Sequence, residues 1–213
     1  MTTTYDCVIM ADGEFPTTEH PLSLLKDAQA IIACDGAICK LHEQGIRPDA
    51  VVGDLDSIPT EMRKIYADRL HQTKEQDTND LTKSAMLARS LGYKSVLILG
   101  ATGLREDHTL GNISLLARYM DWFDCVEILS DYGRFTPINK SCTLTSVAGQ
   151  QVSIFAMDNQ TRITTKGLRW DVTDRIFSTW WQGTLNEAAN TEFSLTFPAG
   201  SKLIIYRAAA ESK

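Results

Sequence analysis

Long apolar runs are missing from this sequence. The first one, Cys7–Ala11, is five residues long, and no basic residue precedes it. A secretory signal needs basic residues followed by at least about seven apolar ones, and a membrane-spanning helix needs about 20. We therefore expect a cytoplasmic protein with neither a signal peptide nor a membrane span.

Cysteine and histidine are scarce and carry no metal-binding spacing. The chain has five cysteines and four histidines, and no Cys-x-x-Cys pair occurs. An odd number of cysteines, three of them inside apolar runs, favours buried free thiols in a reducing compartment over disulfides. The histidines lie too far apart in the sequence to match a zinc motif.

Positive charge is also in deficit. The net charge is −6 and the isoelectric point is about 5.2, so we do not expect nucleic-acid binding through a basic face. With 43% apolar and 23% charged residues, the composition is that of a globular protein. A length of 213 residues fits one large domain or two small ones.

Several well-known catalytic and nucleotide-binding motifs are missing. No two glycines are separated by one residue, so the GxGxxG dinucleotide fingerprint cannot occur. The GxxxxGK[ST] phosphate loop, the GxSxG elbow and the HExxH zinc motif are missing as well. Dinucleotide-binding, P-loop, α/β-hydrolase and HExxH zinc-protease functions are thereby excluded.

What the first part of the chain does contain is an alternation of strands and helices. Strands are expected at Tyr5–Ala11, Ala30–Cys34, Ala50–Gly53, Ser95–Gly100 and Cys125–Ser130. Helices are expected at Leu22–Ala28, Gly36–Glu43, Pro59–Arg69, Asp80–Leu91 and Leu110–Met120. This alternation predicts an α/β domain over residues 1–135, a largely parallel sheet with flanking helices.

After about residue 135 the pattern changes to short strands joined by turns. They are expected at Cys142–Ser146, Gln151–Ala156, Arg162–Thr165, Phe193–Phe197 and Lys202–Arg207. No long helical period is found there. Residues 136–213 are therefore predicted to form a small all-β sandwich or barrel domain.

Carboxylates follow two predicted strands of the first domain. Asp35 follows one strand, and Asp54 and Asp56 follow the next. In an extended segment residues i and i+2 point to the same side, so both carboxylates of the Asp54-Leu55-Asp56 segment can reach one Mg²⁺ ion. The alternative is a turn in which an aspartate caps the backbone. Like charges gathered at one sheet edge favour the metal, since a cation offsets their repulsion.

A second polar cluster, residues 75–80, opens the clearest helix. Asp80 or Asp77 could serve only the helix dipole or a cap. Capping accounts for one or two of these residues, but it does not explain why Gln76, Asp77, Asn79 and Asp80 occur together.

The segment 100–112 has the features of a phosphate-binding loop. Gly100 and Gly103 allow close backbone approach, Thr102 can donate a hydrogen bond, and Arg105 offers a planar fork for phosphate oxygens. The alternative is an exposed loop in which the arginine pairs with a neighbouring carboxylate. His108 fits a packing or capping role as well as a catalytic one.

Together these motifs, over residues 30–115, resemble the thiamine pyrophosphokinase family. The motifs are Cys34-Asp35-Gly36-Ala37, Pro48-Asp49-Ala50-Val51-Val52-Gly53-Asp54-Leu55-Asp56-Ser57-Ile58, Glu75-Gln76-Asp77-Thr78-Asn79-Asp80-Leu81-Thr82-Lys83 and Gly100 to Asn112 with Arg105-Glu106-Asp107-His108. The likeness continues less sharply through Gly167-Leu168-Arg169-Trp170 and Gly183-Thr184-Leu185-Asn186.

The resemblance implies Mg²⁺-dependent transfer of pyrophosphate from ATP to thiamine, giving thiamine diphosphate and AMP. It implies a homodimer whose active site is shared between subunits. The implied metal ligands are Asp35, Asp54, Asp56 and Asp80. The implied ATP-binding residues are Gln76, Asp77, Lys83, Thr102, Arg105 and Asn112, with Asp107 as a further catalytic residue beside Asp54, Asp56, Asp80 and Arg105. The implied thiamine-binding residues are Trp170, Thr184 and Asn186.

Two positions depart from the family pattern. Leu185 stands where a serine is usual, and the loop Gly-Ala-Thr-Gly-Leu-Arg replaces the more usual Gly-Gly-x-Arg. Two other functions are open to the same residues. One is a phosphatase with an aspartyl nucleophile in the Asp54-Leu55-Asp56-Ser57 segment and Lys83 as its partner. The other is a non-catalytic sensor of nucleotide or thiamine diphosphate.

Overall fold

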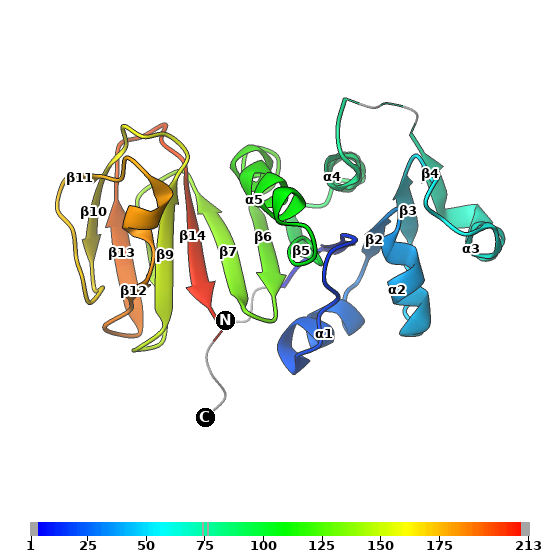
Figure 1. Ribbon diagram of the computed structural model, residues 1–213, viewed down its shortest axis with the longest axis horizontal. Coiled ribbons are helices and arrows are strands. Elements are labelled where there is room, and N and C mark those ends of the chain that lie inside the picture. Colours follow the sequence, from blue (N-terminus) through cyan, green and yellow to red (C-terminus); the bar gives the residue numbers. More distant parts are fainter. Residues whose placement is uncertain (1–3, 74, 76, 210–213) are drawn as a thin grey trace. The chain divides into compact units, whose positions relative to one another are not determined.

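The structure is a computed structural model that describes residues 4–73, 75 and 77–209 (Figure 1). Its contacts divide the chain into two compact units, Met1–Asp131 and Tyr132–Lys213. Each unit has its own buried core. The division between the units falls after Asp131, whereas the sequence predicts a domain boundary near residue 135.

The first unit contains a parallel sheet with the strand order β6-β5-β1-β2-β3-β4. The strands are β1 (Cys7–Met10), β2 (Ile31–Cys34), β3 (Ala50–Gly53), β4 (Leu70–Gln72), β5 (Ser95–Leu99) and β6 (Cys125–Ser130). The helices are α1 (Glu19–Lys26), α2 (Ala37–Glu43), α3 (Thr60–Ile65), α4 (Asp80–Ser90) and α5 (Glu106–Tyr119), with a 3₁₀ turn η1 (Ala67–Arg69). The expected parallel α/β fold is confirmed.

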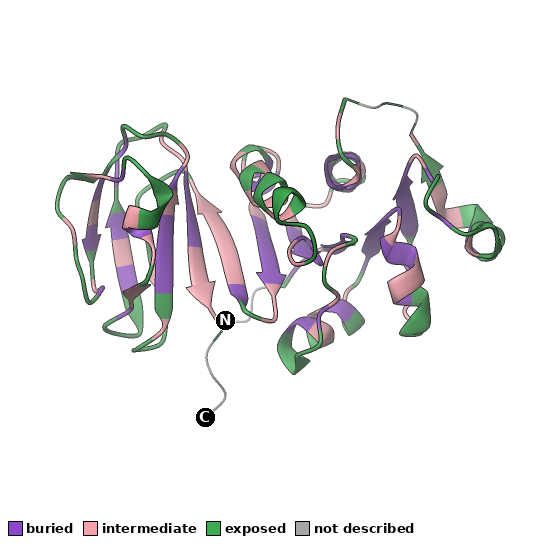
Figure 2. Ribbon diagram, viewed as in Figure 1, coloured by how far each residue is buried: buried purple, intermediate pink, exposed green. Residues whose placement is uncertain are grey.

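The central strands of this sheet are buried on both faces. Every residue of β1, β2 and β3 is buried, because helices cover the sheet from both sides. Figure 2 shows this burial for β2 and β3. Figure 1 shows α1 and α2 on one face and α4 and α5 on the other. Strands β1 to β4 follow one another from the middle of the sheet to one edge, whereas β5 lies on the other side of β1. Ligands of open α/β sheets bind at such a switch point, at the carboxyl ends of the strands.

Three features of the first unit differ from expectation. Helices α1 and α5 begin several residues earlier than predicted, because their first turns carry no apolar periodicity: the first turn of α1 buries only Pro21, and that of α5 buries no residue. The start of α1 is held from a distance: the Asp131 carboxylate accepts hydrogen bonds from the backbone N–H groups of Thr17 at 2.8 Å and Thr18 at 3.1 Å. Strand β4 was not expected, since it is a three-residue edge strand with little burial.

The second unit is a sandwich of two antiparallel sheets, as expected. One sheet has the order β12-β9-β14-β7 and the other β11-β10-β13-β8. The elements are β7 (Gly133–Ile138), β8 (Cys142–Thr145), β9 (Gln151–Ala156), β10 (Arg162–Lys166), β11 (Arg175–Ile176), η2 (Trp180–Gly183), β12 (Asn186–Glu187), β13 (Glu192–Thr196) and β14 (Leu203–Ala208). Strand β7 was missed because it contains Pro137, and proline argues against a paired strand.

The five cysteines are free thiols; Cys7 and Cys34 are buried as expected, whereas Cys39, Cys125 and Cys142 are only half-buried. Burial raises the pKa of Cys34 to about 12, so this thiol is unreactive at neutral pH. Among the described residues, no helix combines the length and the apolar character needed to cross a membrane.

Candidate active site

Three carboxylates converge at the carboxyl ends of β2 and β3. Asp35 follows β2, whereas Asp54 and Asp56 follow β3, and one oxygen of each lies within 4.8 Å of the others. The approach requires a glycine at the end of β3. A Cβ atom on Gly53 would lie 2.6 Å from the Cβ of Asp35, closer than two carbon atoms can pack.

The segment from Asp54 to Asp56, which follows β3, is a turn rather than an extended strand. Leu55 has a φ of 68°, and its backbone N–H donates to Asp35 Oδ2 at 3.1 Å. The N–H of Asp56 donates to Asp54 Oδ1 at 3.1 Å. The prediction that extended geometry brings the two carboxylates together was wrong, although the carboxylates do meet. Burial of the Leu55 side chain, which is 6% exposed, offsets the cost of the left-handed backbone.

Burial and mutual repulsion raise the pKa values of this cluster. Asp35 is 4% exposed, and burial, reinforced by Asp54 and by the charge of Asp80, raises its pKa to about 6. A shared hydrogen bond and repulsion from Asp54 raise the pKa of Asp56. Asp35 Oδ1 is buried and accepts no hydrogen bond from any described residue. A hard divalent cation fits this site, because it takes oxygen ligands, satisfies the buried atom and cancels the repulsion.

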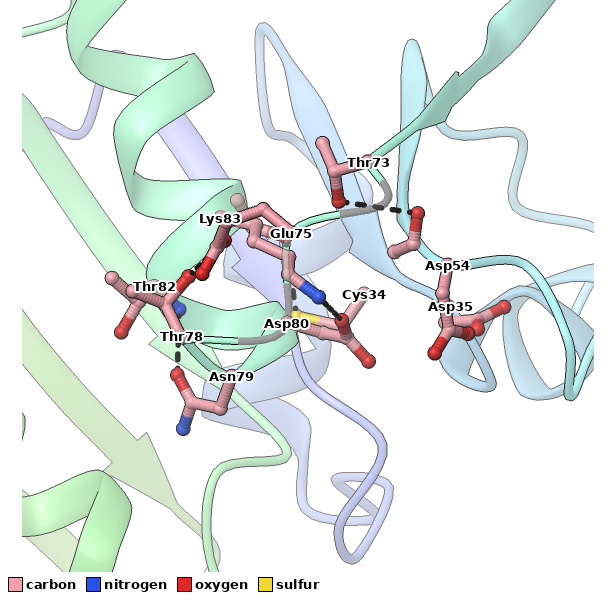
Figure 3. A network of polar contacts seen from close by, with 12 residues as sticks. Cys34, Asp35, Asp54, Thr73, Glu75, Thr78, Asn79, Asp80, Thr82 and Lys83 are labelled. Carbon is pink, nitrogen blue, oxygen red and sulfur yellow. Dashed lines mark hydrogen bonds and ion pairs between the residues drawn. The ribbon is translucent and has the colours of Figure 1, made fainter.

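Helix α4 brings a charged pair to the same edge (Figure 3). Asn79 caps the helix by accepting from the Thr82 N–H at 2.9 Å, so neither Asp77 nor Thr78 is the cap. Lys83 is buried, and its Nζ lies 3.1 Å from Asp80 Oδ1. Asp80 thus lies beside the carboxylate trio but is not part of it. Asp77 is exposed, and Gln76 lies outside the described residues.

The loops after β1 and β5 are joined at the switch point. Gly13 N–H donates to Gly100 O at 2.7 Å, and Glu14 N–H donates to Thr102 O at 2.8 Å. The backbone of Thr102 therefore serves to hold the two loops together. The side chain of Asn112 donates to Ala101 O at 2.8 Å and fixes the same loop from α5.

Arg105 forms an exposed two-point ion pair. Its Nε and Nη2 donate to the two carboxylate oxygens of Asp107 at 3.1 and 2.6 Å. This pair raises the pKa of Arg105 and lowers that of Asp107. The sequence had left open whether the arginine faces phosphate or a neighbouring carboxylate, and in this structure it binds the carboxylate.

A cleft of about 360 Å³ at the switch point brings together some of the predicted residues. Its lining includes Asp35, Asp80, Arg105 and Asn112, together with His108. The predicted residues outside its lining are Asp54, Asp56, Asp77, Lys83, Thr102 and Asp107. The cleft thus lies where the fold predicts a ligand site.

Sequence reasoning missed a lysine that shapes this cleft. Lys40 of α2 donates to the backbone oxygens of Asp12 at 2.8 Å and Gly13 at 2.7 Å, and it pairs with the Asp12 carboxylate at 2.8 Å. It thereby holds the loop after β1, which lines the cleft. The partners are 27 and 28 residues apart, so no local pattern in the sequence could have revealed the contact.

The second unit has its own hollow of about 260 Å³, lined by Trp170, Thr184, Leu185 and Asn186 among others. Asn186 holds the tryptophan loop: its side chain donates to Trp170 O at 2.9 Å and accepts from Trp170 N–H at 3.2 Å. Thr184 donates to Trp181 O at 2.7 Å. Leu185 has a φ of 60°, so its backbone is left-handed rather than extended.

The fold and the site together define a class of protein. The first unit is a doubly wound α/β unit with three carboxylates converging beside a switch-point cleft, and the second is a β-sandwich with a hollow that Trp170 lines. Residues 22–129 match the family model "Thiamin pyrophosphokinase, catalytic domain", and residues 133–206 match "Thiamin pyrophosphokinase, substrate-binding domain". The chain belongs to the thiamin pyrophosphokinase family.

Individual relatives agree with this assignment. Thiamine pyrophosphokinase 1 of Oryza sativa subsp. japonica is 31% identical over 141 residues, which cover 59% of this chain and 53% of the relative. Thiamine pyrophosphokinase 1 of Arabidopsis thaliana is 28% identical over 144 residues, covering 60% and 53%. The chain spans about half the length of the curated relatives that it matches.

Solved structures show the same fold over the whole chain. Thiamin pyrophosphokinase from Geobacillus thermodenitrificans superposes with a TM-score of 0.78 at 24% identity, covering 97% of this chain and 98% of that one. The enzyme from Candida albicans gives a TM-score of 0.78 at 16% identity, covering 99% and 95%. These likenesses establish the two-unit fold.

Proposed function

We propose that this protein is a thiamine pyrophosphokinase, which transfers a pyrophosphoryl group from ATP to the hydroxyl of thiamine and releases AMP. Family membership supports the reaction class. The observation that carries the proposal is the convergence of Asp35, Asp54 and Asp56, in which a buried oxygen of Asp35 has no hydrogen-bond partner among the residues that the structure describes. A protein without a cation to bind would gain nothing from this repulsive arrangement.

In this proposal Asp35, Asp54 and Asp56 hold Mg²⁺, with Asp80 as a further ligand at the start of α4. The ion, when bound, would neutralise charge that develops on the phosphate oxygens. The ion pair with Lys83 orients Asp80 toward the cleft. The cluster is expected to bind the ion together with the nucleotide, because Mg²⁺ prefers a few carboxylates plus phosphate oxygens to an all-protein cage.

The triphosphate is proposed to bind along the loop 100–105 and the start of α5. When the nucleotide binds, the Arg105 guanidinium gives up its two hydrogen bonds to the Asp107 carboxylate and donates two to phosphate oxygens instead. The other proposed ATP-binding residues are Gln76, Asp77, Lys83, Thr102 and Asn112. Asp80 and Asp107 are the carboxylates proposed to accept the thiamine hydroxyl proton through water, although a loose transition state needs little help from a base.

Thiamine is proposed to bind the hollow of the second unit. Thiamine is a cation with two flat rings, so it suits an aromatic face combined with hydrogen-bonding groups, and Trp170, Thr184 and Asn186 supply these. We further propose a homodimer in which the second unit of one subunit completes the active site of the other. The cytoplasmic location stays a prediction.

Incubation with ATP, Mg²⁺ and thiamine, followed by separation of the nucleotides, tests the proposal. The expected result is one AMP for each thiamine diphosphate, with no product when Mg²⁺ or thiamine is omitted. Formation of ADP would indicate an ordinary kinase, and a trapped phosphoryl-aspartate would indicate a phosphatase. Tight nucleotide binding without turnover would indicate a sensor.

A further inference from the structure

Three leucines of the described chain have a left-handed backbone, which is unfavourable for any residue with a Cβ atom. They are Leu55, Leu104 and Leu185, with φ angles of 68°, 59° and 60°. Leu55 is buried in the core of the first unit, which offsets this cost. Leu104 is 72% exposed, so in the free protein its side chain gains little from burial.

The loop around Leu104 is fixed by its neighbours rather than by the leucine itself. Gly103 is also left-handed, with a φ of 77°, and a Cβ atom there would lie 2.5 Å from the Cβ of Glu14. The backbone N–H of Glu14 in turn donates a hydrogen bond to Thr102 O, which joins the loops after β1 and β5. Residue 104 follows directly on this constrained glycine, and glycine or asparagine would adopt its left-handed conformation at lower cost than leucine.

An exposed, strained leucine in a ligand cleft calls for a functional reason. Leu104 lines the 360 Å³ cleft, beside Arg105 and His108. The polar and charged groups of the cleft suit phosphates and a cation, and a leucine side chain cannot bind either. The apolar part of a nucleotide is its flat base.

We propose that Leu104 is the contact surface for the nucleobase of the nucleotide bound in this cleft. That the ligand is a nucleotide rests on the proposed function, whereas the left-handed backbone and the exposure of Leu104 do not depend on it. The base covers the leucine, and the apolar area removed from water on binding compensates for the backbone cost of the free protein. Leu104 is thus a specificity-determining residue for base-containing substrates rather than for phosphates.

Calorimetric titration of Leu104→Asn and Leu104→Gly tests this role. The two probes, each with Mg²⁺, are α,β-methylene-ATP, which cannot release AMP, and inorganic tripolyphosphate, which has no base. We expect Kd for the nucleotide to rise about tenfold, equivalent to about 1.4 kcal/mol, and Kd for tripolyphosphate to change less than about twofold. The ligand-free Tm of Leu104→Asn should equal or exceed that of the wild type, and Leu104→Met should retain nucleotide affinity.

The results that would contradict the role of Leu104 differ from the result that would contradict the proposed function. Equal weakening of both ligands would make Leu104 part of the phosphate-binding loop and overturn the proposal. So would an unchanged Kd for the nucleotide, or weakening of thiamine binding alone. Wild-type protein that binds neither probe would instead overturn the proposed function.

Discussion

Replacing Asp35 with asparagine should stabilise the ligand-free protein at neutral pH. The side chain keeps its shape and can still accept from the Leu55 N–H, but it no longer carries a buried charge. The pKa of Asp35 rises from 3.8 to about 6 on folding, because burial disfavours the charged form. A rise of this size corresponds to about 3 kcal/mol between the fully protonated and fully ionised limits.

The sign of the pH dependence follows from the raised pKa. Below about pH 3.8 the group is protonated in both states and its contribution to stability is complete, and this contribution is lost as the pH rises through about 6. The free energy of unfolding of Asp35→Asn minus that of the wild type should therefore increase by about 2–3 kcal/mol between pH 4 and pH 7.5. Urea denaturation in the presence of EDTA measures this difference directly.

Two controls isolate the effect. Asp6 has a lowered pKa, since its carboxylate accepts from the backbone N–H groups of Lys94 and Ser95. Its contribution to stability is lost only as the pH falls below about 3.8, so the difference for Asp6→Asn should stay nearly constant between pH 4 and pH 7.5. Mg²⁺ should stabilise the wild type at pH 7.5 but stabilise Asp35→Asn much less. A pH-independent difference for Asp35→Asn would refute the reasoning, because Asp35 would then be ionised equally in the folded and unfolded states.

Three further predictions concern activity. Asp54→Asn and Asp56→Asn should each reduce kcat by orders of magnitude while circular dichroism and Tm stay close to wild type, and near-normal turnover would remove these residues from the metal site. Arg105→Lys should lower kcat/KM by the equivalent of about 1–3 kcal/mol, because lysine cannot form a two-point contact, and equal kinetics would place the arginine outside the site. Asn186→Ala should raise KM for thiamine far more than KM for ATP, since its amide holds the Trp170 backbone; similar changes in both constants would argue against a thiamine site there.

The parallel sheet could be predicted because its strands are apolar on both faces and alternate with helices. What the sequence did not reveal are elements without such a signal. Strand β4 is short with little burial, β7 contains a proline, and the first turns of α1 and α5 bury one residue and none, respectively. Apolar periodicity arises where an element packs against a core, so it cannot reveal an element that makes little contact with one.

The candidate site also contains features that could be predicted from the sequence and features that could not. The trio of Asp35, Asp54 and Asp56 was found because strand ends meet at one edge of a parallel sheet, and that rule needs no knowledge of the local backbone. The left-handed turn at Leu55 was missed, because leucine carries no signal for such a conformation. Lys40 was missed because its partners are fixed by tertiary structure alone.

The position of β1 has a consequence for synthesis on the ribosome. This strand is made first, yet it lies in the middle of its sheet, and Val8 must wait for Leu97 before its second edge is paired. At about 5–20 residues per second, the ribosome needs roughly 5–20 s to make the intervening chain. The start of α1 waits longer, until Asp131 emerges to bind Thr17 and Thr18. The nascent chain therefore carries an open apolar strand edge through most of the translation of its first unit, and chaperones that shield such edges should improve its yield.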